Sequence, residues 1–210
     1  MSTMENNQTA KGQSPTQIAE SLRDGGLQAV SFGMGCFWGP DSRFGALDGV
    51  VQTRVGYAGG TYEEPTYRDM PGHAEVVRVT FDPRVLSFEM LFDEFRRWYT
   101  PTKAFGSKYR PAVFTTQPAH SDVVLAFVDT IEDITLRPQT AVSPEETARF
   151  WSAEDYHQKW RLRKANPALA ATLEAEYGSR WDESELATKL NGLEKDELDP
   201  ERFELPAGSV

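Results

Sequence analysis

The chain has 210 residues and a mass of 23.6 kDa, which is enough for one domain with additional tail segments. Its net charge of -10 repels phosphate backbones and anionic lipids, which argues against a nucleic acid or a membrane as the main partner. A single cysteine excludes an internal disulfide and any zinc site with two or more cysteines. Because the N-terminus has no apolar signal region and no apolar run approaches roughly 18 residues, we expect a cytoplasmic protein.

The composition divides the chain into three parts. Residues 1–27 are polar, and we expect a partly disordered lead with a short helix over Gln17–Arg23. Residues 168–210 form an acidic C-terminal extension, and the last thirty-one residues carry nine acidic and four basic side chains, half of the net charge. We expect this end to be a solvated tail with a little helix around Glu183–Leu190. The remaining residues, 28–167, are expected to be the working domain.

Hydrophobic periodicity predicts alternating strands and helices in this middle part. In chain order we expect a strand Ala29–Met34, a helix Trp38–Leu47, strands Val50–Ala58 and Ala74–Phe81, a helix from the Ser87 cap to Tyr99, a strand Tyr109–Thr116, a helix Ser121–Asp129, a strand Ile134–Val142 interrupted by Pro138, and a helix from Ser143 toward Arg163. The core order β-α-β-β-α-β predicts an α+β fold, a ferredoxin-like α/β plait with extra helices and coil.

The single thiol, Cys36, lies between a predicted strand and a predicted helix, in the segment Gly33–Pro40. This position directs backbone N–H groups and the positive end of the helix dipole toward the sulfur, which favours the thiolate. Asp41 opposes that effect, because a nearby negative charge raises the thiol pKa. The alternative is that Cys36 is a small buried hydrophobic residue, as most free cysteines are.

Glu75 begins the apolar face of a predicted strand. Alternation places its side chain on the same face as Val77, Val79 and Phe81. Burial there raises the pKa of a carboxyl group and keeps it protonated near neutral pH. A protonated Glu beside a thiolate would form a nucleophile and acid pair, suited to an oxygen-bearing centre. The alternative is a solvated strand end without a chemical role.

The sequence resembles a known family, the A-type peptide methionine sulfoxide reductases, over about residues 30–164. The motifs that carry the resemblance occur in the family's order and approximate spacing. They are Gly35-Cys36-Phe37-Trp38-Gly39, Gly56-Tyr57-Ala58-Gly59-Gly60, Pro65-Thr66-Tyr67, Gly72-His73-Ala74-Glu75-Val76-Val77, Tyr109-Arg110 and Ala153-Glu154-Asp155-Tyr156-His157-Gln158.

The resemblance implies a reaction and a role for each matching residue. Cys36 corresponds to the nucleophile that attacks the sulfur of methionine-S-sulfoxide and becomes a sulfenic acid. Glu75 corresponds to the acid that protonates the sulfoxide oxygen. Two substrate-binding pairs are implied as well: the hydroxyls of Tyr67 and Tyr109 bind that oxygen, and the rings of Phe37 and Trp38 receive the methyl group. The resemblance also implies a monomer that needs no metal or organic cofactor, only an external thiol reductant.

Three features depart from the family pattern. The chain has no second cysteine to resolve a sulfenic acid, so thioredoxin, glutaredoxin or a small thiol must regenerate Cys36 directly. Ala104 stands where the family has an active-site Asp, so one polar group of the site is missing or replaced. Asp41 stands where the family usually has Glu, which keeps the charge on a shorter side chain.

These departures leave four alternatives open. The scaffold could act on another oxidised sulfur compound, or it could be a non-catalytic module that binds oxidised methionine. A hydrolase could pair Cys36 with His73 or His157, although histidines at such positions are more often structural. A zinc site at Cys36, His73 and Glu75 would require a fourth ligand that the sequence does not indicate.

Overall fold

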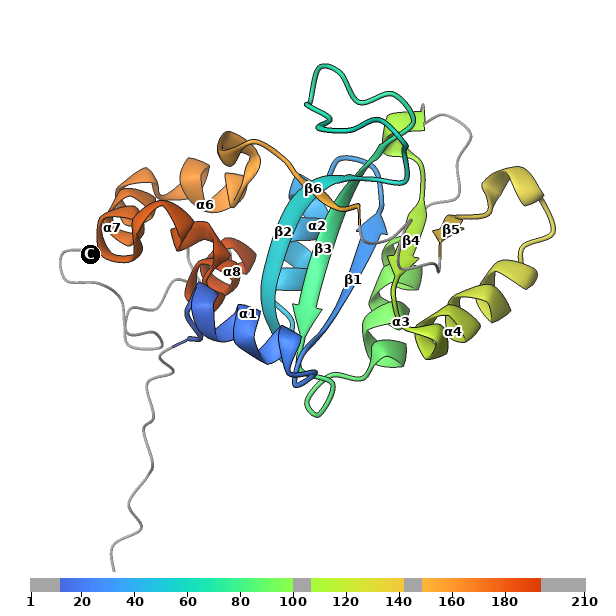
Figure 1. The fold of residues 1–210 in the computed structure, drawn as a ribbon, viewed down its shortest axis with the longest axis horizontal. Helices are drawn as coiled ribbons and strands as arrows, with labels where there is room; N and C mark the ends of the chain where they lie inside the picture. The colour runs from blue at the N-terminus through green and yellow to red at the C-terminus, as the bar shows by residue number, and fades with distance from the viewer. Residues whose placement is uncertain (1–11, 100–106, 142–148, 194–210) are drawn as a thin grey trace, which may run out of the picture.

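The computed structural model describes residues 12–99, 107–141 and 149–193. A mixed six-stranded sheet with the order β5-β4-β1-β3-β2-β6 lies at the centre of the molecule (Figure 1). Neighbouring strands are antiparallel except for β4 and β5, which run parallel. The strands are β1 (Gln28–Gly33), β2 (Val50–Ala58), β3 (Ala74–Phe81), β4 (Ala112–Thr115), β5 (Gln139–Ala141) and β6 (Trp151–Ser152).

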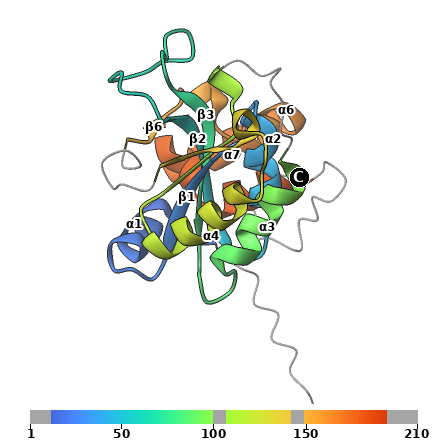
Figure 2. The same cartoon turned by 90° about the vertical axis from the view of Figure 1, so that its right-hand side faces the viewer.

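The four inner strands and two helices form the expected plait. Helix α2 (Trp38–Gly45) connects β1 to β2, and α3 (Phe88–Trp98) connects β3 to β4. Together with the strand order β4-β1-β3-β2, these connections give the β-α-β-β-α-β arrangement predicted from the sequence. Helix α4 (Pro118–Asp129) lies beside α3, as the rotated view also shows (Figure 2).

The main core lies between the sheet and the helices α2, α3 and α4. Aromatic rings dominate it: Phe32 of β1 stacks on Phe44 of α2 at 5.0 Å and on Phe95 of α3 at 5.2 Å. Ser87 caps α3 through a hydrogen bond from the backbone N–H of Met90, as its sequence position predicts. The apolar stripe of α3 therefore packs into the core against β1.

Both ends of the described chain pack more tightly than the sequence suggests. Helix α1 (Pro15–Arg23) buries Ile18, which confirms the short N-terminal helix. The elements α7 (Pro167–Tyr177), η4 (Gly178–Glu183) and α8 (Glu185–Gly192) form a helical layer beside β2 with α6 (Trp160–Ala165), as Figure 1 shows. Trp181 is only 1% exposed in this layer, so the expectation of a solvated tail is wrong for residues 180–193.

Other elements differ from the sequence prediction. The expected strand Tyr109–Thr116 begins only at Ala112, and Tyr109 instead ends a short helical turn, η1 (Ser107–Tyr109). The expected strand Ile134–Val142 begins with the turn η2 (Ile134–Leu136), and only Gln139–Ala141 are extended. The expected helix from Ser143 toward Arg163 is wrong over residues 149–159, which contain β6 and the turn η3 (Asp155–His157). The proposed start of that helix, at Ser143–Glu146, lies outside the described residues.

Candidate active site

Cys36 is an exposed residue of the loop between β1 and α2, and its sulfur is half-buried. Gly35 precedes it with φ +88°, a left-handed conformation that side-chain-bearing residues rarely adopt. This turn directs the chain from the C-terminal end of β1 into the first turn of α2. The backbone N–H of Trp38 then hydrogen-bonds the sulfur, as the position before a helix predicts.

The environment of Cys36 has opposing effects on its protonation. Burial of the sulfur raises the pKa of the Cys36 thiol above its ordinary value, the Trp38 N–H lowers it, the Glu75 carboxyl raises it and Lys108 lowers it. The net direction is a raised pKa, although the Trp38 N–H at the start of the helix lowers it, as the position of Cys36 before a helix predicts.

Asp41 does not act on the thiol in the way that the sequence suggests. Its carboxylate is buried within α2 and lies 3.3 Å from the Lys159 ammonium group. The hydroxyl of Thr53 and the side-chain amide of Asn191 also donate hydrogen bonds to it, at 2.5 and 2.9 Å. This carboxylate therefore holds α2 against β2, α6 and α8 and is compensated by its own cation.

Glu75 lies at the beginning of β3 with its side chain 1% exposed. Its Oε2 accepts a hydrogen bond of 3.2 Å from the backbone N–H of Phe37, the residue after the thiol. Burial raises the pKa of Glu75 above its ordinary value, and the Phe37 N–H and Lys108 oppose that shift only in part. The carboxyl group thus tends to keep its proton beside the thiol, as the alternating strand pattern predicts.

Two tyrosine hydroxyl groups meet near the thiol and the carboxyl. A hydrogen bond to Tyr67 is the largest cause that raises the pKa of Tyr109, and burial, Glu75 and Cys36 raise it further. Tyr109 therefore remains a neutral hydrogen-bond donor at physiological pH. The two residues come from separate segments, Tyr67 from the loop between β2 and β3 and Tyr109 from η1.

Glu154 fixes the loop that carries Tyr67. Its Oε1 accepts a hydrogen bond of 3.0 Å from the Tyr67 backbone N–H, and its Oε2 accepts one of 2.7 Å from the hydroxyl of Tyr57 on β2. Burial raises the pKa of Glu154, but these two hydrogen bonds together with His157 bring it below its ordinary value. The ionised Glu154 carboxylate thus connects the segment before η3 to β2 and to the loop of Tyr67. Sequence reasoning missed this role.

Aromatic rings line one side of the site. Phe37 is 1% exposed, and its ring centre lies 6.4 Å from that of Trp38 and 5.1 Å from that of His157. The indole of Trp38 stacks on Trp160 of α6 at 4.4 Å with an interplanar angle of 9°. Phe37 and Trp38 therefore lie together as the motif predicts, whereas the stack with Trp160 was not predicted because α6 approaches only in the folded chain.

Lys108 reaches the centre of the site from η1. Its Nζ lies 3.3 Å from Oε1 of Glu75 and 3.3 Å from the centre of the Tyr67 ring. Sequence reasoning missed this residue, although its position immediately before Tyr109 was a usable signal. Ala104, where the family pattern has Asp, lies outside the described residues.

The two histidines considered as bases have different surroundings. Both ring nitrogens of His73 are occupied, since Nδ1 accepts from the Gly60 N–H at 3.3 Å and Nε2 donates to the Tyr62 carbonyl at 2.8 Å. The structure thus leaves His73 no nitrogen to activate Cys36. His157 is 2% exposed, and burial lowers its pKa below the ordinary value, which makes it a neutral wall of the site.

Two further observations limit the kinds of site. Among the described residues, no group of three or more His, Cys, Asp or Glu side chains has an arrangement that could hold a metal ion. Over the same residues, no helix is both long and apolar enough to cross a membrane.

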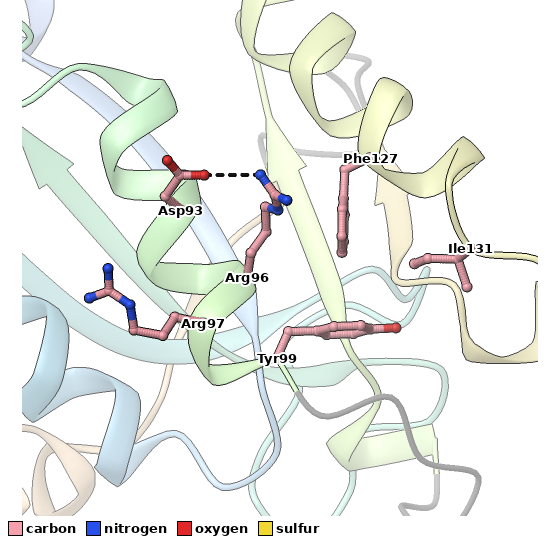
Figure 3. Close-up of a pocket in the computed structure, with 6 residues that line it drawn as sticks. All are labelled: Asp93, Arg96, Arg97, Tyr99, Phe127 and Ile131. Atoms are coloured by element: carbon pink, nitrogen blue, oxygen red, sulfur yellow. Dashed lines mark hydrogen bonds and ion pairs between the residues drawn. The ribbon is translucent and has the colours of Figure 1, made fainter.

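A separate open hollow of about 550 Å³ lies between α3 and α4 (Figure 3). Asp93, Arg96, Arg97, Tyr99, Phe127 and Ile131 line it. Both arginines are paired within α3, Arg96 with Asp93 at 3.0 Å and Arg97 with Glu94 at 2.6 Å. None of the candidate site residues lines this hollow, so it is distinct from the site around Cys36.

Comparisons with known proteins identify relatives of the chain and of its fold. The family model described as "Peptide methionine sulfoxide reductase" matches residues 28–188. A peptide methionine sulfoxide reductase of Acidobacterium capsulatum is 41% identical over 147 residues, 64% of this chain and 93% of that protein. One of Drosophila melanogaster is 35% identical over 196 residues, 91% of this chain and 76% of that protein.

Solved structures agree with the sequence relatives. Methionine sulfoxide reductase A of Corynebacterium diphtheriae has a TM-score of 0.56 and 30% identity, over 68% of this chain and 76% of that one. Mxr1 from Saccharomyces cerevisiae in its reduced form has a TM-score of 0.56 and 26% identity, over 69% and 88%. The fold and its relatives together define an α+β oxidoreductase. The chain belongs to the peptide methionine sulfoxide reductase family, A type, and is a peptide-methionine (S)-S-oxide reductase.

Proposed function

We propose that Cys36 and Glu75 together carry out the reduction of methionine-S-sulfoxide, protein-bound or free, in this chain. The main supporting observation is the hydrogen bond from the Phe37 N–H to the Glu75 carboxyl, which holds a buried acid beside the residue that follows the nucleophile. A nucleophile and an acid in fixed proximity are what an oxygen transfer from sulfoxide to thiol requires.

The proposed reaction transfers one oxygen and two electrons. The thiolate of Cys36 attacks the sulfoxide sulfur and forms a bond between the two sulfurs, and Glu75 gives its proton to the sulfoxide oxygen. The substrate S–O bond and then the S–S bond break as the oxygen and its proton pass to the Cys36 sulfur, which leaves a sulfenic acid on Cys36 and releases methionine as the reduced sulfide. The Cys36 sulfur loses two electrons and is oxidised, and the substrate sulfur gains these two electrons and is reduced. The raised pKa of Glu75 supports its role as the acid, because the group retains a proton to give.

Two pairs of side chains are proposed to hold the substrate. The hydroxyls of Tyr67 and Tyr109 bind the sulfoxide oxygen, and their mutual hydrogen bond supports this by bringing both donors to one place. The rings of Phe37 and Trp38 receive the methyl group, since an apolar face suits a small apolar group. In this arrangement only one configuration at sulfur presents its oxygen to the donors while its methyl group lies on the rings.

Regeneration of Cys36 is proposed to come from outside the chain. With one cysteine in the sequence, a thiol of thioredoxin, glutaredoxin or a small molecule attacks the sulfenic acid. We propose no metal or organic cofactor, a monomer as the working form, and a cytoplasmic location, where cellular reductants keep thiols available.

A stereochemical assay tests this proposal. A peptide with both epimers of methionine sulfoxide is incubated with the protein and dithiothreitol, and chromatography measures each epimer. We expect loss of the S epimer alone and no turnover with Cys36→Ser. As a control, Ser42→Ala changes a buried hydroxyl in α2 without touching the thiol. Loss of neither epimer would contradict the proposal and would favour another oxidised sulfur compound or a binding module.

A further inference from the structure

The position of Lys108 gives the site a feature that the motif residues do not explain. Its ammonium group lies 3.3 Å from Oε1 of Glu75, while the Phe37 N–H occupies Oε2 of the same carboxyl. The side chain is held in place by the face of the Tyr67 ring at 3.3 Å and by the Tyr67 carbonyl at 3.4 Å. The cation is therefore fixed against a reacting group and is not a solvated surface charge.

We propose that the Lys108 ammonium group is the fixed positive charge that compensates the reaction's moving negative charge, first on Cys36 and then on Glu75. This proposal rests on the roles of Cys36 and Glu75 given above. It assigns to Lys108 an electrostatic role in the oxygen transfer, in addition to any contact with substrate.

The charge balance of the reaction carries the argument. Before attack the reactive form contains a Cys36 thiolate, a protonated Glu75 and the Lys108 cation, with a net charge of zero. After oxygen transfer it contains a neutral sulfenic acid, a Glu75 carboxylate and the same cation, again with a net charge of zero. The negative charge thus moves from sulfur to carboxylate beside one cation that does not move. This fixed cation stabilises the transition state, and no charged or polar group has to reorient during the reaction.

Burial explains why this compensation is needed. The Glu75 side chain is 1% exposed, so the carboxylate left after proton donation has almost no water to solvate it. Lys108 lowers the pKa of both Glu75 and Cys36, but burial has the larger effect on each and the net shift of both is upward. The cation therefore moderates the cost of ionising either group.

Other titratable groups also face this centre. Glu154 is ionised and occupied by the Tyr57 hydroxyl and the Tyr67 N–H. His157 is kept neutral by burial and by Lys108 itself, and the hydrogen bond to Tyr67 raises the pKa of Tyr109. These groups belong to β2, the loop between β2 and β3, the segment Glu154–His157 and η1. Glu154 and Tyr109 keep their hydrogen-bond partners in a Lys108 variant, whereas loss of the cation also raises the pKa of the buried His157.

Lys108→Gln tests the proposal because it keeps a polar side chain and removes the charge. Two quantities are measured across pH: the alkylation rate of Cys36 with iodoacetamide, and methionine release in a single turnover without reductant. Loss of a cation should raise the pKa of both reacting groups by about one unit. We therefore expect the alkylation curve and both limbs of the rate profile to move to higher pH. Lys108→Arg should restore the wild-type profile.

Controls separate a charge effect from a packing effect. Lys108→Met keeps the apolar stem over Tyr67 and gives a second neutral variant, and circular dichroism checks that each variant is folded. Arg84→Gln removes an exposed charge beyond the opposite end of β3 and should leave both curves unchanged.

Several outcomes would overturn the proposal. It is wrong if both neutral variants keep the wild-type alkylation curve, if they lower the rate without moving either limb, or if Lys108→Arg behaves like Lys108→Gln. Alkylation does not depend on reductase activity, so the effect of Lys108 on Cys36 is measurable even if neither epimer is reduced. Failure of the proposed function and failure of this inference are thus distinguishable.

Discussion

At Glu75, one side chain combines a proposed role as proton donor with a place in a folded strand. Its Cα pairs with that of Tyr57 across β2 and β3, so the carboxyl group is fixed by the sheet and not by a loop. Burial raises the pKa of Glu75, and the Phe37 N–H ties the carboxyl to the loop of Cys36. In the proposed reaction, the proton donor is therefore held in a rigid part of the molecule.

Glu75→Gln keeps the shape of this side chain and removes its ability to give a proton. We expect the single-turnover rate to fall by roughly 10²-fold or more, the range for loss of a general acid. Wild-type activity should decline as pH rises through the raised pKa of Glu75, because the acid form disappears. In Glu75→Gln that decline should be absent, while the rise due to thiolate formation on Cys36 should remain.

A matched control for this variant is Glu94→Gln, which changes a carboxylate paired with Arg97 on the surface of α3. It should have the wild-type rate and pH profile. Wild-type activity in Glu75→Gln would show that another group protonates the sulfoxide oxygen.

At the scale of elements, a buried ion pair fastens α2 to three other parts of the fold. Lys159 has no exposed surface, and its Nζ lies 3.3 Å from Asp41 and 2.5 Å from the Thr53 carbonyl. Its backbone has φ 48°, a left-handed conformation that is unfavourable for a residue with a side chain. Because α2 begins two residues after Cys36, this network also fixes the helix end that faces the thiol.

Lys159→Met tests the contribution of this ion pair to stability. The variant leaves the Asp41 carboxylate buried without its cation, which should lower the free energy of unfolding by about 3–5 kcal/mol in urea titrations. Lys164→Met, on the exposed side of α6, should change it by no more than about 0.5 kcal/mol. Adding Asp41→Asn to Lys159→Met should recover part of the loss, and no recovery would show that the cost comes from packing alone.

The elements also show what sequence reasoning can reach. Strands β2 and β3 were predicted at both ends because valine-rich segments with clear turn signals form strands in many contexts. The helix predicted from Ser143 toward Arg163 was wrong over residues 149–159 because β6 forms only by pairing with Gly56 and Tyr57, about ninety residues earlier. A side chain on Gly56 would contact the Trp151 carbonyl at 2.2 Å, and local propensity contains no such information.

The same distinction applies to the site. The proximity of Cys36, Glu75, Phe37 and Trp38 was predictable because each occurs within a short motif beside a strand or helix end. The contact of Lys108 with Glu75 was not, since it depends on how η1 folds back onto the start of β3, although the place of Lys108 beside Tyr109 was a usable signal. The direction of the Cys36 pKa shift stayed open in the sequence, because it depends on how far burial outweighs the helix end in the folded molecule.

At the scale of the whole molecule, the helical layer after β6 has a structural role. The amide of Asn191 in α8 reaches the Asp41 carboxylate, and the Lys189 ammonium donates to the Leu47 carbonyl at 2.6 Å. The Gln13 N–H in turn bonds to the Glu185 carboxylate at 2.8 Å. The C-terminal helix α8 thus packs on α2 and the residues after it, and the N-terminal segment is bonded to α8 in turn.

The molecule as a whole holds one thiol, and this determines how the catalytic cycle must proceed. A sulfenic acid on Cys36 has no second cysteine in the same chain, so no intramolecular disulfide can form. Without added reductant we expect a burst of one methionine per chain, followed by no further turnover, with the sulfenic acid trapped by dimedone and located by mass spectrometry.

With limiting reductant, the rate-determining step should be the attack of an external thiol on Cys36, since each turnover leaves the enzyme oxidised until a second molecule arrives. Steady-state turnover should then be first order in thioredoxin, glutaredoxin or dithiothreitol, and independent of the methionine sulfoxide concentration once the substrate saturates. Cys36→Ser, which lacks the only thiol, should show neither the burst nor the dimedone adduct. A wild-type burst larger than one methionine per chain would require an electron source other than Cys36, and the single-thiol cycle would be wrong.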